Sequence, residues 1–107
     1  MGYLQPNRRT DQPEAVNIAA AATLTKFQTY VRVETADGAF TLTLPHVTDA
    51  AGVIICITKI DSSANACTLA DDGGAEDWSN LTIDAINDSV VLLSDGFKWH
   101  TLSNEIA

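Results

Sequence analysis

The strongest constraint on how this chain folds is a regular alternation of apolar and polar residues in two segments of its first half. In residues 29–35, Val31 and Val33 alternate with polar side chains, and residues 40–44 alternate in the same way. A period of two places the apolar side chains on one face, so each segment is predicted to be a half-buried strand. The residues between them, Ala-Asp-Gly at 36–38, are a tight-turn signal, because glycine tolerates the positive φ that such turns require. The sequence therefore predicts a first hairpin here.

Pro45 is predicted to end the second of these strands. Proline has no N–H to donate to a sheet, so the strand should stop at Leu44, and residues 46–51 should form a loop. Residues 52–60 follow as a more continuously apolar segment. The missing alternation indicates a strand that is buried on both faces, either under a second sheet or against a neighbouring subunit.

Strand-like segments and polar turns continue to the end of the chain. We expect a turn at 61–65, a strand at 66–70, a polar loop at 71–77, a short strand at 78–83, a strand at 90–93, a turn at 94–96 and a last strand at 97–102. Each turn contains the Asp, Asn, Ser or Gly residues that favour chain reversal. Together the segments predict an all-β fold, a small sandwich or flattened barrel of about seven or eight antiparallel strands.

Charge and hydropathy exclude two classes of partner. The net charge is −8, and residues 33–107 contain two lysines against twelve acids. Because binding a phosphate backbone depends on Lys and Arg, nucleic acid is not an expected ligand. No run of about 18 apolar residues is present, and the first nine residues lack the apolar core of a signal peptide, so we expect no membrane partner.

The N-terminal part of the chain differs from the rest. Residues 1–14 contain Pro6 and Pro13 and few apolar side chains, which indicates an extended arm without a core of its own. The alanines within residues 17–26 favour a helical turn, but the threonines that follow at strand-like intervals favour an extended conformation. A chain of 107 residues is one domain, which we divide into an arm and lead-in over 1–26 and a β-domain over 27–107.

The arm is the expected docking element. Residues 1–32 carry four basic and two acidic residues, so a weakly basic arm precedes an acidic body. Such an arm is suited to an acidic protein surface, and a merely solvated tail is the alternative. Its candidate partner-binding residues are Tyr3, Leu4, Arg8 and Arg9.

A group of motifs in the second half of the chain resembles a small β-domain found in bacteriophage virion proteins. The motifs are Leu44-Pro45, the apolar run 52–57, the stretch I-T-K-x-D-S-S-x-N at 57–65, the D-S-V and S-D-G motifs within 88–96, and Trp99. The resemblance extends from about residue 35 to residue 102 and leaves the arm unmatched. It implies a virion component that forms a homotrimer, with Trp99 closing one end of the domain.

The resemblance leads to a structural function. We expect a capsid decoration (cement) protein on the outer surface of the phage head, which binds the major capsid protein as a trimer and stabilises contacts between its subunits. The alternative is a tail-fibre or receptor-binding tip that recognises a host surface glycan. The step to a decoration protein rests on a chain that contains this domain and an arm. The residues expected in the subunit interface or core are Val53, Ile55, Ile57 and Trp99.

The two cysteines form no recognisable motif. Cys56 and Cys67 lie in apolar surroundings, and free cysteine behaves as a small hydrophobe, so we expect two buried, reduced thiols. A disulfide is the alternative because both flank the turn at 61–65, but the bacterial cytosol in which a phage protein assembles is reducing. A metal site would need further Cys or His ligands at suitable spacing.

No reactive constellation stands out. Asp71, Asp72, Glu76 and Asp77 resemble a calcium loop in composition, but they lack the alternating ligand positions and the terminal bidentate Glu of an EF-hand, so we expect an exposed turn. The two histidines, His46 and His100, have no neighbouring Ser or Cys in a nucleophile motif. We therefore expect no catalytic, cofactor-binding or metal-binding residues and no enzyme.

Aromatic side chains are the remaining candidates for ligand binding, because sugars stack on exposed aromatic rings. Trp99 is expected in the core. Trp78 lies between Asp77 and Ser79, and this polar neighbourhood leaves both a core position and an exposed sugar platform open.

Overall fold

The computed structural model describes residues 14–71, 73–78 and 81–106 and is all-β in this part of the chain. The strands are β1 (Glu14–Ile18), β2 (Ala22–Thr23), β3 (Gln28–Val33), β4 (Phe40–Thr43), β5 (Ile54–Lys59), β6 (Cys67–Ala70), β7 (Leu81–Ile83), β8 (Ser89–Ser94) and β9 (Trp99–Glu105). In these ranges we find no helix of the length and apolarity needed to cross a membrane. The arm residues Tyr3, Leu4, Arg8 and Arg9 lie outside the described residues.

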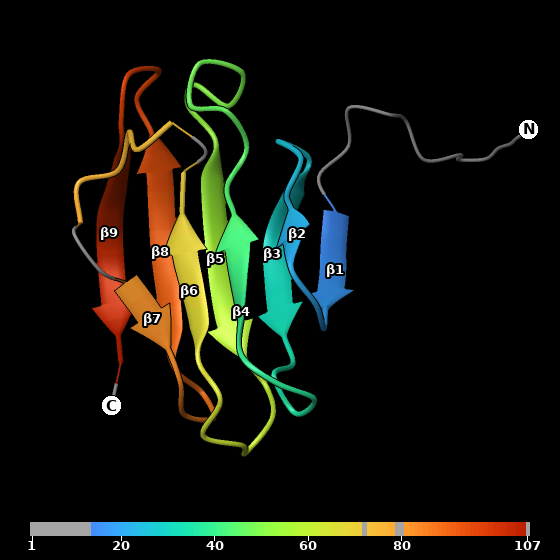
Figure 1. Ribbon diagram of the computed structural model, residues 1–107. Helices are drawn as coiled ribbons and strands as arrows, with labels where there is room; N and C mark the ends of the chain where they lie inside the picture. The colour runs from blue at the N-terminus through green and yellow to red at the C-terminus, as the bar shows by residue number, and fades with distance from the viewer. Residues whose placement is uncertain (1–13, 72, 79–80, 107) are drawn as a thin grey trace, which may run out of the picture.

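The strands form two sheets that face each other (Figure 1). The larger sheet has the strand order β1-β3-β5-β8-β9, and the smaller sheet has the order β2-β4-β6-β7. From β1 to β6 the chain crosses to the opposite sheet after every strand, so that neighbours within a sheet are not consecutive in sequence. This part of the chain winds as a flattened coil, and the prediction of an all-β fold is confirmed.

The prediction of an antiparallel fold is wrong for the coil. The pairs β1–β3, β3–β5, β2–β4 and β4–β6 are all parallel, and each sheet is therefore mixed. The predicted first hairpin is absent because β3 and β4 belong to different sheets, as do β5 and β6. The apolar side chains of β3 and β5 face those of β4 and β6 across the core. An alternating pattern specifies which face of a strand is buried, and it contains no information on which strand lies beside it.

The last three strands close the coil with antiparallel pairs. β7 turns back beside β6, β8 returns to the larger sheet beside β5, and β9 pairs with β8. The predicted hairpin around residues 94–96 is confirmed. Gly96 has a φ of +93° in this turn, which is the left-handed region that glycine adopts without strain.

The core lies between the two sheets. Alternate residues of each strand point inward, as in β8, where Val90 and Leu92 are buried. Trp99 is fully buried at the start of β9, and its indole N–H donates to the Pro45 carbonyl at 3.2 Å. A buried side chain of this size contributes several kcal/mol of hydrophobic stabilisation, with its one polar atom satisfied.

Two expectations about the first half differ from the structure. The segment 52–60 is buried on its inner face alone, where Ile55 and Ile57 are inaccessible, whereas Ile54 is 51% exposed. The lead-in is part of the two sheets, because β1 pairs with β3 and β2 pairs with β4. Short strands such as β2 have little pattern of their own and are ordered by pairing with a neighbour, so a boundary at residue 27 does not separate the described strands.

Candidate interaction surface

The outer face of the larger sheet is apolar at its centre. On β3, β5 and β8 the residues that alternate with the core positions point away from the smaller sheet. We call the apolar members of this set the apolar face: Tyr30, Ile54, Cys56, Val91 and Leu93. Tyr30 is 40% exposed and Ile54 is 51% exposed, and the other three side chains are half-buried.

The strand register makes these residues contiguous. Cys56 lies between Tyr30 on β3 and Val91 on β8, and Ile54 lies beside Leu93. Side chains two residues apart on one strand share a face, so the two rows adjoin each other. None of the outward positions on these three strands is a carboxylate, although the chain has a net charge of −8.

A third row of outward residues lies beside the apolar face, and it has opposite charges at its two ends. The register joins Arg32, Thr58, Ser89 and Glu105 across β3, β5, β8 and β9. Arg32 lies beside Asn17 of β1 and donates a hydrogen bond from its Nε to the Asn17 side chain. The Arg32 guanidinium lies 5.5 Å from the centre of the Tyr30 ring. The larger sheet therefore has a cation toward β1, a glutamate on β9 and an uncharged apolar centre.

The outer face of the smaller sheet is of a different kind. Thr41, Thr68 and Thr82 form a row across β4, β6 and β7, and Thr23 lies beside Thr43. We call these five residues the threonine face. Its hydroxyls lie on a surface of the sheet that is exposed or half-buried, with a methyl group beside each one.

A buried lysine fixes the connection between β5 and β6. Lys59 is inaccessible to solvent, and its Nζ donates to the carbonyls of Asp61 at 2.8 Å and Ser63 at 2.7 Å. The same ammonium lies 3.1 Å from the Asp61 carboxylate. Thr35, in the connection between β3 and β4, donates its backbone N–H to the other Asp61 oxygen at 2.8 Å. The network joins two successive turns of the coil through charge-assisted hydrogen bonds.

This network also stabilises the charged form of Asp61. Burial opposes ionisation and is the largest single influence, but the hydrogen bonds from Ser63, Thr35 and Lys59 together outweigh it. The pKa of Asp61 is consequently held well below its ordinary value. The network's hydrogen bonds run to backbone groups of the two connections, so its role is to hold the fold together.

The loop between β6 and β7 protects the exposed edge of the larger sheet. Ala75 accepts the Trp99 N–H at 2.7 Å, and the Trp99 carbonyl accepts the Asp77 N–H at 3.0 Å. The Asp77 carboxylate also accepts the N–H of Thr101 at 3.2 Å. These bonds pair the first part of β9 on its outer side, which is one way in which natural sheets block edge-to-edge association.

The expectation of an exposed acidic turn is wrong for Asp71. This residue is 8% exposed, and its Oδ2 accepts the N–H groups of Gly73 at 2.7 Å and Ala75 at 3.1 Å. The Glu76 carboxylate turns back to the Asp71 N–H. Within the described ranges no three His, Cys, Asp or Glu side chains are arranged to hold a metal ion. Asp72 lies outside those ranges.

The two histidines lie apart. His46 is exposed and bonds to the Thr48 hydroxyl at 2.8 Å. His100 lies with its Nε2 2.7 Å from Asp95 and its Nδ1 3.6 Å from Asp77. The hydrogen bond from His100, with those from the N–H groups of Phe97 and Lys98, holds the pKa of Asp95 at about 2. Asp95 thus organises the tip of the β8–β9 hairpin.

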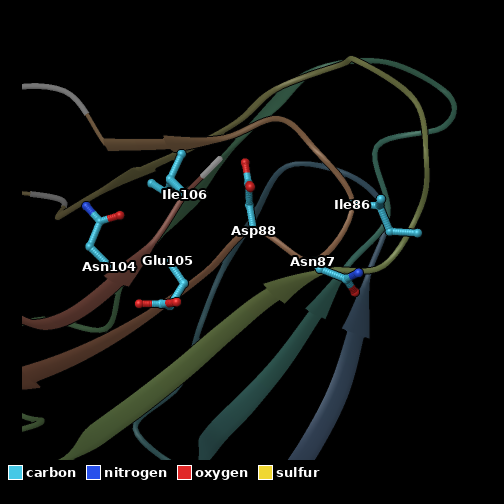
Figure 2. Close-up of a pocket in the computed structure, with 6 residues that line it drawn as sticks. All are labelled: Ile86, Asn87, Asp88, Asn104, Glu105 and Ile106. Carbon is cyan, nitrogen blue, oxygen red and sulfur yellow. The ribbon is translucent and has the colours of Figure 1, made fainter.

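An open hollow of about 380 Å³ lies where the β7–β8 connection meets the end of β9. Figure 2 shows that Ile86 and Asn87 approach it from one side and Asn104 and Glu105 from the other, with their polar ends pointing in different directions. The Asp88 carboxylate accepts the N–H groups of Asp84 and Ala85 and so stabilises the turn. The side chains do not converge on a point where a ligand would bind.

The cysteines and tryptophans occupy distinct environments. Cys67 is buried in the core, where burial raises its pKa to about 12, and Cys56 is half-buried on the apolar face. Both are free thiols. Trp78 is half-buried, and its indole N–H donates to the Leu69 carbonyl at 3.0 Å. Phe97, at the hairpin tip, is 86% exposed.

The residues expected in the subunit interface or core lie mainly inside the sandwich. Ile55, Ile57 and Trp99 are fully buried, and Val53 is partly buried against the core. The sequence reasoning did not identify the apolar face itself. The signal was the loss of alternation in two segments, 53–57 and 90–93, which the structure places side by side as β5 and β8.

Comparison of the chain with protein-family models, curated proteins and solved structures finds no match.

Proposed function

We propose that this protein is a capsid decoration protein of a bacteriophage, which binds the outer surface of the head as a trimer and stabilises contacts between major capsid subunits. The observation that carries the proposal is the apolar face, because a sandwich whose core is already closed between its sheets presents further large apolar side chains, Tyr30 and Ile54, on its outside. Contiguous apolar surface of this kind marks interaction sites. The resemblance of the motifs at 44–99 to phage virion domains suggests the class of assembly.

Stabilisation of a shell follows from mass action. A protein that binds the assembled shell and not its dissociated subunits stabilises the shell by an amount that grows with the logarithm of its concentration over its dissociation constant. Each copy contributes modestly, and the contributions sum over the particle. No chemical step enters this mechanism.

The test is thermal release of DNA from particles with and without the protein, measured by dye access, with host adsorption measured on the same particles. We expect shells that lack the protein to have normal geometry and to rupture at a lower temperature, and purified protein to restore the difference. An unchanged rupture temperature together with lost adsorption would refute the decoration role.

The arm is assigned to attachment. Removal of residues 2–13 spares β1, which begins at Glu14, so the truncated protein should keep its fold. We expect it to bind shells much more weakly, with Arg8 and Arg9 responsible for the salt-dependent share. Binding as tight as that of the full chain would exclude the arm as the anchor.

One observation favours the second candidate, a receptor-binding tip for a host glycan. Phe97 is 86% exposed on a hairpin tip that Asp95 holds in place, and an exposed, positioned aromatic ring is a surface on which a sugar stacks. Counting copies per particle separates the two candidates, since a decoration protein is present in hundreds of copies and a tail tip in a few dozen at most.

A further inference from the structure

We infer that the apolar face is the surface through which copies of this chain associate, with Arg32 of one copy against Glu105 of the next. The inference rests on the self-association within the proposed function and is independent of attachment to a shell. Its occupant is a second copy of the chain.

The first argument is the composition of the apolar face. A partner-binding surface has an apolar centre depleted of charge and a polar rim. Tyr30, Ile54, Cys56, Val91 and Leu93 form such a centre, and Asn17, Thr58 and Ser89 lie in the polar row beside it.

The second argument is electrostatic. Copies with a net charge of −8 repel each other over most of their surfaces. The outward positions of β3, β5 and β8 carry no carboxylate, so two copies that meet through this face bring no acids of these strands together. The exposed acids that surround His100 lie beyond it, around β9.

The third argument is the arrangement of the two charges in one row. Arg32 lies toward the β1 side and Glu105 lies on β9, with Thr58 and Ser89 between them. A head-to-tail contact places the Arg32 of one copy near the Glu105 of the next, and repetition of such a contact closes a ring when the rotation permits. Complementary charges at the rim set the orientation of the copies more than their affinity.

The threonine face provides the matched control. Thr68 lies on β6, an inner strand of the smaller sheet, as Ile54 lies on β5, an inner strand of the larger one, and both side chains point outward. Ile54→Glu buries a charge only if the apolar face is an interface, whereas Thr68→Glu leaves a charge in water.

Light scattering and native mass spectrometry of the full chain test the inference. We expect wild type and Thr68→Glu to form trimers of equal stability at micromolar concentration. Ile54→Glu and Tyr30→Glu should associate about 30-fold or more weakly than wild type. Circular dichroism and thermal unfolding must show that the variants remain folded. A monomeric wild type, or folded Ile54→Glu and Tyr30→Glu proteins that remain trimers, would overturn the inference.

Charge exchange tests the orientation. Arg32→Glu and Glu105→Arg should each weaken association about 2- to 5-fold, and the double variant should restore it. A double variant as weak as the worse single one would overturn the head-to-tail arrangement. A trimer that forms through this face and fails to bind shells would refute the decoration role alone. A monomer that binds shells would refute this inference and the proposed trimer, and it would leave the decoration role standing.

Discussion

The two sheets have equivalent inner faces and different outer faces. Leu42 and Leu69 of the smaller sheet are as deeply buried as Ile55 and Ile57 of the larger one. Outside, the smaller sheet carries the threonine face and the larger sheet carries the apolar face. Threonine and isoleucine both favour strands, so strand formation does not explain the difference. What differs is the chemistry of the exposed side chains: the smaller sheet presents hydroxyls, which hydrogen-bond to water, and the larger sheet presents aliphatic and aromatic groups, whose exposure to water is unfavourable.

We expect the largest loss of stability from a cavity in the core between the two sheets. Trp99→Ala leaves a large cavity between the sheets and an unpaired Pro45 carbonyl, so the free energy of unfolding should fall by about 3–5 kcal/mol. Urea denaturation measures the change. Phe97→Ala, two residues earlier in the same hairpin, is the control, because the exposed ring should contribute less than about 0.5 kcal/mol.

The next effect acts on the turn that joins the sheets. Lys59→Met preserves most of the side-chain volume but leaves the Asp61 carboxylate and two backbone carbonyls without the ammonium, so we expect a loss of about 3 kcal/mol. Lys98→Met, at an exposed position, is the matched control and should change stability by less than about 0.5 kcal/mol. Equal effects of the two substitutions in thermal unfolding would show that the buried network does not stabilise the fold.

The pH dependence shows whether the network acts through charge. Because the pKa of folded Asp61 is lowered, its stabilisation is complete above the unfolded value of about 4 and is lost as the pH falls toward the folded value. Wild type should therefore exceed Asp61→Asn in unfolding free energy at pH 7, and the gap should narrow below about pH 4. A gap that stays constant from pH 7 to pH 3 would contradict the electrostatic origin.

The smallest effect on stability comes from making the two outer faces alike. Thr41→Val with Thr68→Val replaces hydroxyls by methyl groups in one row, and each change should alter the free energy of unfolding by less than about 0.5 kcal/mol. The new apolar row should nevertheless produce species larger than the wild-type assembly, because exposed apolar patches associate. Size-exclusion chromatography that shows wild-type behaviour would mean that the hydroxyls do not keep this face free.

The sequence predicts the strands of this protein better than their arrangement. The alternation around Val31 and Val33 identifies β3, and Ser94-Asp95-Gly96 identifies the last hairpin. The turn signal at Gly38 predicts a hairpin, whereas the turn belongs to a connection between the two sheets. Turn residues satisfy the local backbone in either case, so the parallel coil depends on long-range pairing that no local pattern contains.

The apolar face was predictable in part. The unbroken apolar run at 52–57 shows that this strand has apolar side chains on both faces, and the outward ones are Ile54 and Cys56. The run at 90–93 carries the same signal. The burial of Lys59 had no such signal, because a lysine at a strand end is usually exposed, and its partners become apparent only when the turn after β5 folds back over it.

Alkylation of Cys56 tests the central claim most directly, because this thiol lies in the middle of the apolar face. Cys67 is an internal reference, since its burial and its pKa of about 12 make it unreactive in the folded protein. With the label located by mass spectrometry, we expect Cys56 to react at least about 10-fold more slowly in wild type than in Ile54→Glu at the same micromolar concentration, and to react faster as wild type is diluted. Equal rates in the two proteins, unaffected by dilution, would show that the apolar face is not covered by a second copy.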